Sequence, residues 1–301
     1  MLYDLIVVGK GPAGLSAAIY AIRAGLSVLV IGRDAGALAT ADLIENYLGF
    51  PEPVHAAKLM ADSEAQARRL GVEILTEEVT GLLFMENYGV QTTTRELEAK
   101  SLVIATGMPR KKATVPGLAE FEGRGVSYCA TCDGFFYRGK KVAVIGNGDY
   151  AFKEASELKP FASRITLLTN DRPYEASLSD DEAITVDLRK IAAVSGDEIK
   201  VRRIEMADGS VLEVDGVFVA EGTASAVDLA QKLGLANDGK VITVNSRDQD
   251  TNLPGVFAAG DCTGGLLQIA VAVGDGARAG LAAANYVRQL NGEKEVKVQW
   301  H

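Results

Sequence analysis

The chain of 301 residues is long enough for two domains, and its apolar fraction of 48%, charged fraction of 24% and 32 glycines are typical of a soluble α/β protein with many tight turns. Forty acidic residues against 31 basic ones give a net charge of −9, which argues against a general nucleic-acid binder. Three cysteines are too few for a disulfide scaffold, no apolar run is long enough to span a membrane, and no signal peptide precedes the first apolar run, so we expect a cytoplasmic protein.

The N-terminal segment has the order of a nucleotide-binding unit. Leu2–Val8 is an apolar run that predicts a buried parallel strand, Pro12–Ala24 carries helix formers, and Ser27–Ile31 predicts a second strand. Between the first strand and the helix lies a G-x-G-x-x-G turn that begins at Gly9. This order makes the glycine turn a dinucleotide fingerprint, and a turn that binds nothing is the less favoured alternative.

Each glycine of the turn has its own expected task. Gly9 allows the turn, Gly11 lets the backbone approach a pyrophosphate, and Gly14 permits close packing of helix on strand. The helix N-terminus supplies free N–H groups for the phosphates. Asp34, twenty residues after Gly14, is a candidate to bind a ribose hydroxyl.

The following segments predict the rest of the first domain. Leu38–Phe50 lacks periodicity and predicts a loop over the cofactor, whereas Lys58–Leu70 predicts an amphipathic helix. We expect strands at Val72–Leu75, Gly81–Met85, Tyr88–Thr92 and Leu102–Ile104, the second and third of them as a hairpin. The last strand ends at Ala105-Thr106-Gly107, and a charged linker follows at Met108–Lys112.

Two cysteines one helical turn apart stand at mid-chain, in Cys129-Ala130-Thr131-Cys132-Asp133. In a chain with β-α-β signals, C-x-x-C predicts a dithiol/disulfide pair whose first thiol, at a helix start, has a lowered pKa. A zinc site is the alternative, but it needs two more soft ligands, and the chain offers only Cys262, His55 and His301. We therefore favour redox chemistry and expect no metal.

A second strand–turn–helix–strand unit follows the cysteines, with the glycine turn Gly146–Ala151 between the strand Lys141–Ile145 and a helix to about Leu158. Further strands are predicted at Ile165–Leu168, Ile199–Glu205, Val211–Val214, Val217–Val219 and Gly255–Asp261, and a long helix at Gln268–Leu290. The last strand and helix would complete the first domain. We therefore expect an α/β fold of two Rossmann-like, three-layer domains, with residues 114–241 inserted between residues 1–113 and 242–301.

Three features together resemble one family, the low-molecular-weight thioredoxin reductases, over essentially the whole chain. They are the first glycine turn, the C-A-T-C-D sequence before a second G-x-G-x-x-A, and A-A-G-D near the C-terminus. The resemblance implies FAD, a homodimer, and a dithiol that passes electrons to a thioredoxin-like protein. The residues that it places at FAD are Gly9, Gly11, Pro12, Ala13, Gly14, Asn46, Ala105, Thr106, Gly107, Gly260, Asp261, Gln268, Ile269 and Ala270.

The resemblance also assigns roles at the dithiol. Cys132 would face the flavin, Cys129 would attack the substrate disulfide, and Asp133 would carry the thiol proton. Because one dithiol must meet both flavin and partner, the resemblance implies a rotation of the two domains. A redox sensor that holds FAD without turnover is the alternative from another class.

The chain departs from the family where its members bind NADPH. The arginine cluster that pairs with the 2′-phosphate is replaced by Thr169–Glu175, in which Asp171 would repel that phosphate. In the second glycine turn, Asp149 competes with a pyrophosphate for the helix N-terminus, and Tyr150 is expected to crowd its approach. The later Gly-x-x-Pro-Asn is Gly222–Ala226, without proline or asparagine.

Two electron donors could replace NADPH. Asp171, twenty residues after Ala151, has the spacing of an acid that binds the ribose of NADH. Alternatively, Glu45–Phe50 and Gly260–Gly264 resemble an atypical, ferredoxin-dependent branch of the family, which we favour because pyrophosphate site and phosphate clamp are altered together. An acidic ferredoxin would need a basic patch, for which Arg110, Lys111, Lys112, Arg138, Lys140 and Lys141 are the candidates. A further hypothesis stacks Trp300 or His301 on the flavin.

Overall fold

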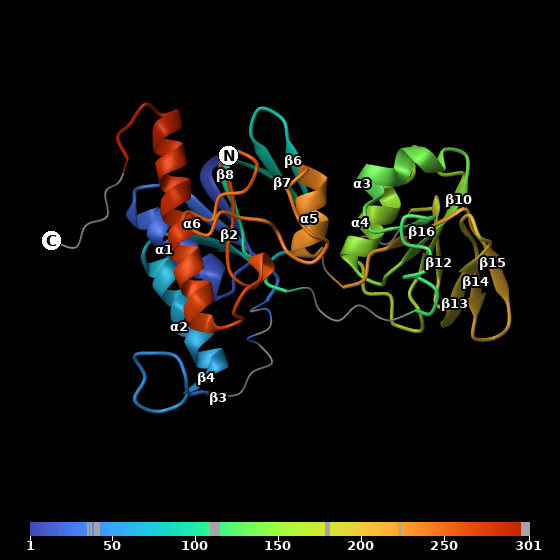
Figure 1. Ribbon diagram of the computed structural model, residues 1–301, viewed down its shortest axis with the longest axis horizontal. Helices are drawn as coiled ribbons and strands as arrows, with labels where there is room; N and C mark the ends of the chain where they lie inside the picture. Colours follow the sequence, from blue (N-terminus) through green and yellow to red (C-terminus); the bar gives the residue numbers. More distant parts are fainter. Residues whose placement is uncertain are drawn as a thin grey trace. The chain divides into compact units, whose positions relative to one another are not determined.

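The structure is a computed structural model that describes residues 1–34, 36, 38, 43–108, 115–177, 181–222 and 224–295, without the side chain of Cys132. The chain forms two compact units (Figure 1), one of Met1–Pro109 with Ser225–His301 and the other of Arg110–Ala224. The predicted insertion ended later, at residue 241. Most of the expected linker, from Pro109 to Lys112, lies outside the described residues.

Helix α5 (Ala226–Leu233) explains the earlier boundary, because it packs on strand β6 (Val79–Phe84) of the first unit. Its Lys232 donates a hydrogen bond of 3.2 Å to the carbonyl oxygen of Thr80. The helix starts with a capping box in which Ser225 Oγ accepts from the N–H of Asp228 and the Asp228 carboxylate accepts from the N–H of Ser225. The S-x-x-D signal for this helix was present in the sequence.

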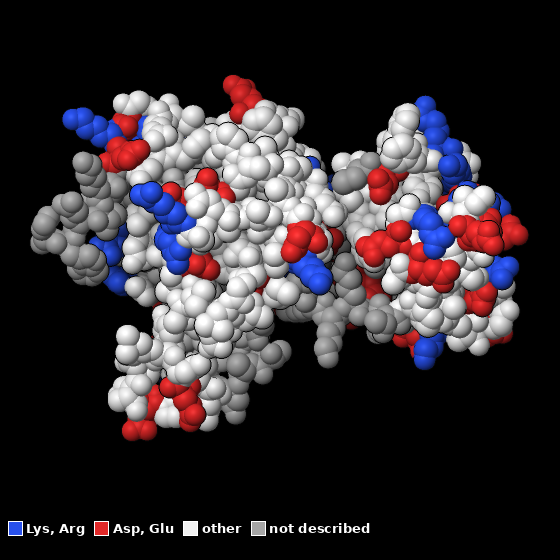
Figure 2. Space-filling model, viewed as in Figure 1, with Lys and Arg blue, Asp and Glu red and all other residues white. Residues whose placement is uncertain are grey.

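Charged side chains of both signs lie on the surface in scattered groups. On the face drawn in Figure 2, basic and acidic side chains are interspersed over the second unit. Among the described residues, no helix combines the length and the apolar composition that crossing a bilayer requires.

The first unit is built on a sheet of seven described strands in the order β5-β2-β1-β8-β7-β6, with β17 also paired to β8. Its strands are β1 (Leu2–Val8), β2 (Val28–Ile31), β5 (Glu73–Leu75), β6, β7 (Tyr88–Thr92), β8 (Glu96–Ile104) and β17 (Val256–Ala258), and a separate pair is β3 (Leu43–Ile44) with β4 (Val54–His55). Strand β8 pairs in parallel with β1 along its length, antiparallel with β7 at its start, and in parallel with β17 at its end. The β6–β7 hairpin confirms the prediction.

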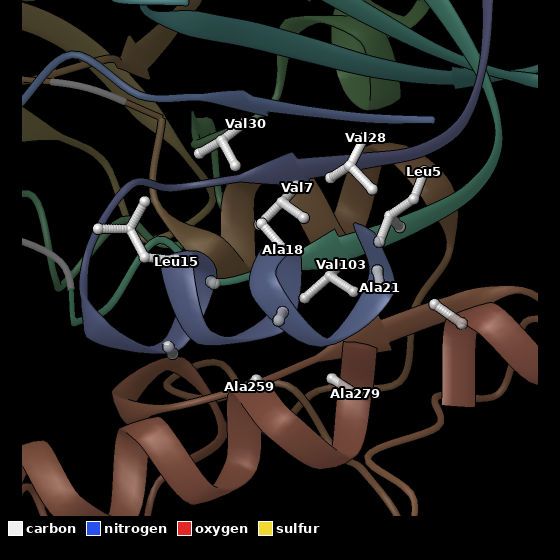
Figure 3. Packing of buried hydrophobic residues seen from close by; sticks show 14 of the residues in the cluster. Leu5, Val7, Leu15, Ala18, Ala21, Val28, Val30, Val103, Ala259 and Ala279 are labelled. Atoms are coloured by element: carbon white, nitrogen blue, oxygen red, sulfur yellow. The ribbon is translucent and has the colours of Figure 1, made fainter. Parts of the chain in front are cut away.

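Two helices of the first unit pack closely through small residues. Helices α1 (Pro12–Arg23) and α6 (Ile269–Leu290) touch where a Cβ on Gly276 would lie 2.1 Å from the carbonyl oxygen of Ala13, and one on Gly280 would lie 2.2 Å from that of Ala17. Any larger side chain would therefore push the helices apart. The third long helix of the unit is α2 (Ala56–Arg69). Figure 3 shows buried side chains of the core between α1 and the sheet, among them Leu5, Val7, Leu15, Val28, Val30 and Val103, each at most 2% exposed.

The second unit combines a parallel and an antiparallel sheet. Five strands are parallel in the order β12-β11-β10-β16-β9, and β13-β14-β15 are antiparallel. The strands are β9 (Val126–Ser127), β10 (Lys141–Ile145), β11 (Arg164–Leu168), β12 (Ile184–Asp187), β13 (Ile191–Gly196), β14 (Val201–Met206), β15 (Val211–Glu213) and β16 (Gly216–Val219). The helices are α3 (Ala130–Asp133), the 3₁₀ turn η2 (Gly134–Tyr137) and α4 (Asp149–Glu157).

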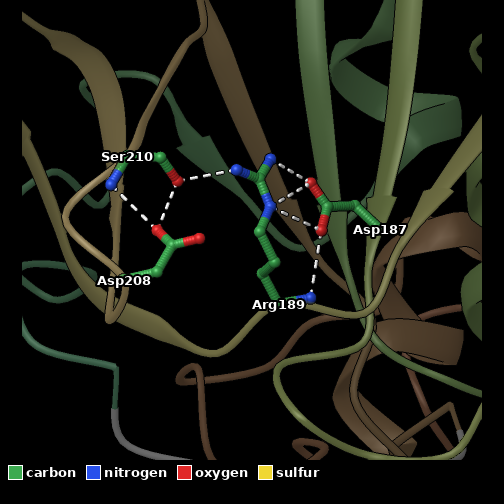
Figure 4. A network of polar contacts seen from close by, with 4 residues as sticks. All are labelled: Asp187, Arg189, Asp208 and Ser210. Atoms are coloured by element: carbon green, nitrogen blue, oxygen red, sulfur yellow. Dashed lines mark hydrogen bonds and ion pairs between the residues drawn. The ribbon is translucent and has the colours of Figure 1, made fainter.

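One arginine joins the two sheets of this unit (Figure 4). Arg189 pairs with Asp187 at the end of β12, and its Nη1 donates to Ser210 Oγ over 2.6 Å, where Ser210 lies in the turn between β14 and β15. The arginine beside Asp187 lowers the pKa of that carboxyl.

The predicted α/β class is confirmed, and each unit contains a parallel β-α-β core. The sequence interpretation contained neither β12 nor β13. Both are short, and along each of them buried and more exposed side chains are mixed, so neither has the continuous apolar run by which strands such as β10 and β11 were recognised.

Candidate functional site

The first glycine turn has the geometry expected of a dinucleotide fingerprint. A Cβ on Gly9, whose φ is +113°, would lie 2.2 Å from the carbonyl oxygen of Ala105, and one on Gly14 would lie 1.9 Å from that of Gly9. Around a Cβ on Gly11, in contrast, no described atom lies within 4 Å. The protein itself therefore requires the first and third glycines, and the second leaves space that a ligand can approach.

The start of α1 suits an anion. Gly11 is the N-cap and makes no side-chain cap, Pro12 occupies the first turn, and no acidic residue lies in that turn. The backbone N–H groups of Ala13 and Gly14 lie in this turn, where an α-helix has no internal acceptors for them. This end of α1 is therefore electropositive and can bind a pyrophosphate.

The segment after β8 borders the same turn. Ala105 donates its N–H to the carbonyl oxygen of Val8 over 2.7 Å, which holds Ala105-Thr106-Gly107 beside Gly9. The Thr106 hydroxyl is buried and has no hydrogen-bond partner among the described residues. A buried hydroxyl without a partner is costly, so a bound group that hydrogen-bonds to it fits this place.

The C-terminal part of the first unit meets the fingerprint through Gly260. A Cβ there would lie 2.8 Å from the Cβ of Ala13, so the turn after β17 lies against the start of α1. Asp261, which follows, is half-buried, and its burial together with the nearby Asp275 carboxylate raises its pKa.

Two of the expected flavin residues are bonded to each other. The Asn46 side-chain amide donates to Gln268 Oε1 over 2.9 Å, and Gln268 is the N-cap of α6. Ile269 and Ala270 form the first turn of that helix. The loop that contains Asn46 and the N-terminus of α6 are thereby joined on one side of the unit.

Asp34 has local partners. It lies three residues after β2 ends at Ile31, where its carboxylate accepts from the N–H of Gly36 over 2.8 Å and pairs with Arg33 at 3.2 Å. A ribose hydroxyl would share this carboxylate with those two groups.

The dithiol region is oxidised and enclosed. Cys129 is disulfide-bonded and 3% exposed, and its N–H donates to Ser127 Oγ over 3.1 Å. The side chain of Cys132 lies outside the described part of the chain, although its backbone belongs to α3. Asp133 ends α3, is half-buried, and donates its N–H to the Cys129 carbonyl over 3.2 Å.

Glu154 is a residue of this region that the sequence interpretation missed. It is 1% exposed, and its Oε2 accepts the N–H of Ala130 over 2.7 Å. A signal was present, because Glu154 lies on the helix face that also buries Ala151, Ala155 and Leu158. A charged residue on such a face needs a specific partner.

The second glycine turn keeps its backbone form. A Cβ on Gly146 would lie 2.2 Å from the carbonyl oxygen of Ala220, whereas around one on Gly148 no described atom lies within 4 Å. We had expected Tyr150 to crowd the approach of a pyrophosphate, and this expectation was wrong. The Tyr150 side chain is 1% exposed and packed into the core. An aromatic side chain at this point of α4 is buried by the apolar face of the helix.

The segment after β11 folds over this second turn. The carbonyl oxygen of Asn147 accepts the N–H of Glu175 over 2.8 Å, and the Asn147 amide donates to the carbonyl oxygen of Pro173 over 3.0 Å. The Asp149 carboxylate accepts both the N–H and the hydroxyl of Ser177, over 2.7 and 2.9 Å. Protein groups therefore occupy the edge of the turn.

Cys262 is a separate, free thiol in the first unit. It is 1% exposed, donates to the carbonyl oxygens of Ile104 and Ala259, and burial raises its pKa to about 12. These properties fit a structural thiol. In the part of the chain that the structure describes, no three His, Cys, Asp or Glu side chains are grouped to hold a metal ion.

Comparison with known proteins identifies the family. The model of the pyridine nucleotide-disulphide oxidoreductases matches residues 3–276. Thioredoxin reductase of Bacillus subtilis (strain 168) is 35% identical over 305 residues, which cover 96% of this chain and 96% of that protein. The chain belongs to the thioredoxin reductase family. It is therefore an FAD-binding disulfide oxidoreductase, and the open Gly11 and the buried Thr106 hydroxyl fit that cofactor.

Solved structures from the family resemble the chain over nearly its whole length. An atypical thioredoxin reductase from Desulfovibrio vulgaris Hildenborough is 41% identical with a TM-score of 0.91, covering 95% of this chain and 98% of that one. A ferredoxin-flavin thioredoxin reductase from Clostridium acetobutylicum is 33% identical with a TM-score of 0.70, covering 97% and 99%.

Proposed function

We propose that this thioredoxin reductase takes electrons from ferredoxin or another donor without nicotinamide and passes them through Cys129 and Cys132 to a thioredoxin-like protein. The single observation that carries the choice of donor is that residues 173–177 are bonded to the second glycine turn at Asn147 and Asp149. There the Asp149 carboxylate lies in the first turn of α4 and is hydrogen-bonded to Ser177. A pyrophosphate at that helix end would face a negative charge and would have to displace residues 173–177.

The hydrogen bonds of Arg172 also argue against NADPH as the donor. It is the arginine of the segment that replaces the family's phosphate clamp, and it needs a free guanidinium to bind a 2′-phosphate. Its Nη2 instead donates to Glu221 Oε1 over 2.9 Å, and its Nε donates to the carbonyl oxygen of Thr169 over 3.1 Å. Two relatives whose names mark them as atypical or ferredoxin-dependent are consistent with this choice.

The proposed roles of the chain's own groups follow the resemblance. FAD, when bound, supplies two-electron redox chemistry. Two electrons and two protons break the disulfide of Cys129 and form two thiols, of which the Cys132 thiol is the flavin-proximal one. The Cys129 thiolate then attacks the partner's disulfide and forms a mixed disulfide with it. The Cys132 thiolate attacks the Cys129 sulfur of this mixed disulfide, which releases the reduced partner and restores the disulfide between Cys129 and Cys132. Asp133 carries the proton in these exchanges.

Anaerobic titration of the oxidised holoenzyme tests the donor. We expect reduced ferredoxin to bleach the flavin and NADPH to leave it oxidised at micromolar concentrations. With ferredoxin present, a disulfide in added thioredoxin should then open over many turnovers. Rapid bleaching by NADPH would refute the proposed donor, and a single turnover would favour the redox sensor.

NADH is a second candidate, favoured by the position of Asp171. This exposed residue follows the end of β11 by three residues and has a φ of +63°, and it stands in the same place relative to β11 as Asp34 does to β2. An acid near the end of such a strand can bind an unphosphorylated ribose. Adding NADH as a third reductant in the same titration decides, because bleaching by NADH but not by NADPH is expected only for this candidate.

The proposed docking of ferredoxin uses basic residues beside the dithiol segment. Arg110, Lys111 and Lys112 lie outside the described residues. Arg138, Lys140 and Lys141 are exposed, with Lys140 also donating to the carbonyl oxygen of Phe136 over 2.8 Å. Reversing the charges at 138 and 141 should slow flavin reduction by ferredoxin at low salt and leave reduction by dithionite unchanged.

The proposed function includes a role for the C-terminal tail and a homodimeric assembly. Trp300 and His301 lie outside the described residues, so their stacking on the flavin stays a prediction. Deleting both should change the flavin spectrum. A homodimer is proposed from the resemblance, and light scattering of the holoenzyme measures it directly.

A further inference from the structure

The side chain of Lys10 crosses the carboxyl edge of the first unit's sheet. Lys10 stands between the first two glycines of the fingerprint turn, just after β1, and its Nζ donates to the Thr76 hydroxyl over 3.1 Å. Thr76 directly follows β5. Strand β2 lies between β1 and β5 and is parallel to β1 and β5, so the Lys10 side chain spans the carboxyl ends of three strands.

Gly32, directly after β2, leaves the room that this crossing needs. A Cβ there would lie 2.9 Å from Cγ of Lys10 and 2.8 Å from its backbone nitrogen. Gly32 also donates its N–H to the carbonyl oxygen of Leu75 over 3.1 Å, which joins the end of β2 to the end of β5. Any side chain at position 32 would therefore push Lys10 away from the edge.

Lys10 brings a positive charge to this edge. Its side chain is partly exposed, and a lysine in contact with water is protonated at neutral pH. In the described part of the chain no carboxylate forms an ion pair with Lys10. The neighbouring carboxylates of Asp34 and Glu78 both lie near Arg33 instead, at 3.2 and 3.6 Å. The Thr76 hydroxyl occupies one of the three N–H donors of the ammonium, so two remain at the edge where dinucleotides bind.

We propose that Lys10 recognises the adenosine diphosphate half of FAD, as a cation that donates hydrogen bonds to a phosphate or ribose oxygen. The pyrophosphate of FAD is anionic, and the start of α1 that suits it follows Lys10 in the same turn. Lysine binds phosphate as a point charge, without the fixed geometry that arginine requires. The bond to Thr76 holds the ammonium over the strand ends, which reduces the side-chain entropy lost when the cofactor binds.

The test is the release of FAD from the diluted holoenzyme, followed at equilibrium by the fluorescence of free FAD. Lys10→Met keeps the length of the side chain and removes the charge. We expect it to raise the dissociation constant of FAD about tenfold at low salt. At about 0.3 M salt the difference from wild type should be smaller, because salt screens the attraction that only wild type has. Lys10→Arg keeps the charge and should stay within about threefold of wild type.

Two further variants separate the charge of Lys10 from a structural tie between strand ends. Thr76→Val removes the hydroxyl but leaves the charge, so we expect a change of less than about threefold. The matched control is Lys58→Met, which removes a lysine of α2 that pairs with Asp62 at 2.7 Å and should leave FAD release unchanged. A structural tie predicts that Lys10→Met and Thr76→Val weaken FAD binding equally, at both salt concentrations. That result, or wild-type affinity in Lys10→Met, would refute the proposal.

Competition by fragments of FAD locates the contact within the adenosine diphosphate half. If Lys10 binds a phosphate, Lys10→Met should weaken displacement of FAD by ADP and leave displacement by adenosine unchanged. If it binds the ribose, both fragments should lose affinity. Unchanged competition by both fragments would refute the proposal, even where FAD itself binds more weakly. If Lys10→Met fails to fold, Thr76→Val decides, because only a structural tie predicts that it releases FAD at both salt concentrations.

The inference concerns FAD and does not depend on the electron donor or on the partner of the dithiol. Bleaching of the flavin by NADPH would overturn the proposed donor and leave the role of Lys10 intact. Tight FAD binding by Lys10→Met would do the reverse.

Discussion

The side-chain amide of Asn46 donates a 2.9 Å hydrogen bond to Oε1 of Gln268, a residue 222 positions later in the chain. The bond joins the loop after β3 to the N-cap of α6. The family resemblance placed both residues at the flavin, and the fold brings them together. Their amides thus form one edge of the proposed cofactor site.

This arrangement predicts that both amides contribute to FAD retention. We expect Asn46→Ala and Gln268→Ala each to weaken FAD binding by about 0.5–1.5 kcal/mol, the usual contribution of one hydrogen bond, which is roughly threefold to tenfold in the dissociation constant. The dissociation constant is measured by following FAD fluorescence while the apoprotein is reconstituted. Gln289→Ala is the control, because Gln289 lies at the other end of α6 and bonds to Glu295. Equal affinity of all four proteins would remove Asn46 and Gln268 from the site.

The two glycines at the start of α1 should respond differently to the same substitution. Gly11→Ala should leave the unfolding free energy within about 0.5 kcal/mol of wild type, because no described atom lies near the added carbon, yet lower FAD affinity at least about tenfold. Gly14→Ala should destabilise the apoprotein by about 1–3 kcal/mol through its clash with Gly9. Chemical denaturation of both apoproteins, with FAD titration, checks this. Full FAD binding by Gly11→Ala would contradict the pyrophosphate assignment.

An exposed aromatic pair follows the dithiol and is expected to contact the thioredoxin-like partner. Phe135 and Phe136 are 63% and 67% exposed, their rings contact each other, and they lie in η2, which directly follows α3, so they form a small apolar patch that a docked partner can cover. Truncating a docking aromatic costs more than about 1 kcal/mol, so Phe136→Ala should lower kcat/KM for thioredoxin about fivefold or more, mainly through KM. Phe84→Ala, at a phenylalanine 63% exposed on β6, is the matched control. Equal losses in the two variants would argue against docking.

The buried thiol of Cys262 predicts a specific alkaline instability. Its pKa is raised from an ordinary value near 9 to about 12, so the folded state keeps a proton that the unfolded state loses. The stabilisation is complete below pH 9, and the free energy of unfolding should fall by about 1.4 kcal/mol per pH unit between pH 9 and 12 from this group. Urea denaturation of wild type and Cys262→Ala over this range isolates the contribution as the difference in slope. Parallel slopes would contradict it, as would alkylation of Cys262 in the native protein at pH 8.

Much of the fold follows from local sequence alone. The run Leu2–Val8, the glycines at 9, 11 and 14, and the helix after them predicted the first β-α-β unit, because strand burial and tight turns impose strong local requirements. The small strand β12 and the helix α5 were missed, although α5 carried its capping signal. A short strand or helix with a weak local pattern is hard to recognise from sequence, because the contacts that stabilise it are made by residues distant in the chain.

The sequence by itself determined the chemistry present in the chain: a dinucleotide turn with its required glycines, a C-x-x-C, and a second turn with an acid where phosphate would bind. Only the tertiary structure decided how those groups are used. It buried Tyr150, paired Arg172 with Glu221, folded residues 173–177 over Asn147 and Asp149, and placed Glu154 at the N–H of Ala130. The reason is that burial and hydrogen-bond pairing depend on residues distant in sequence, which no local pattern specifies.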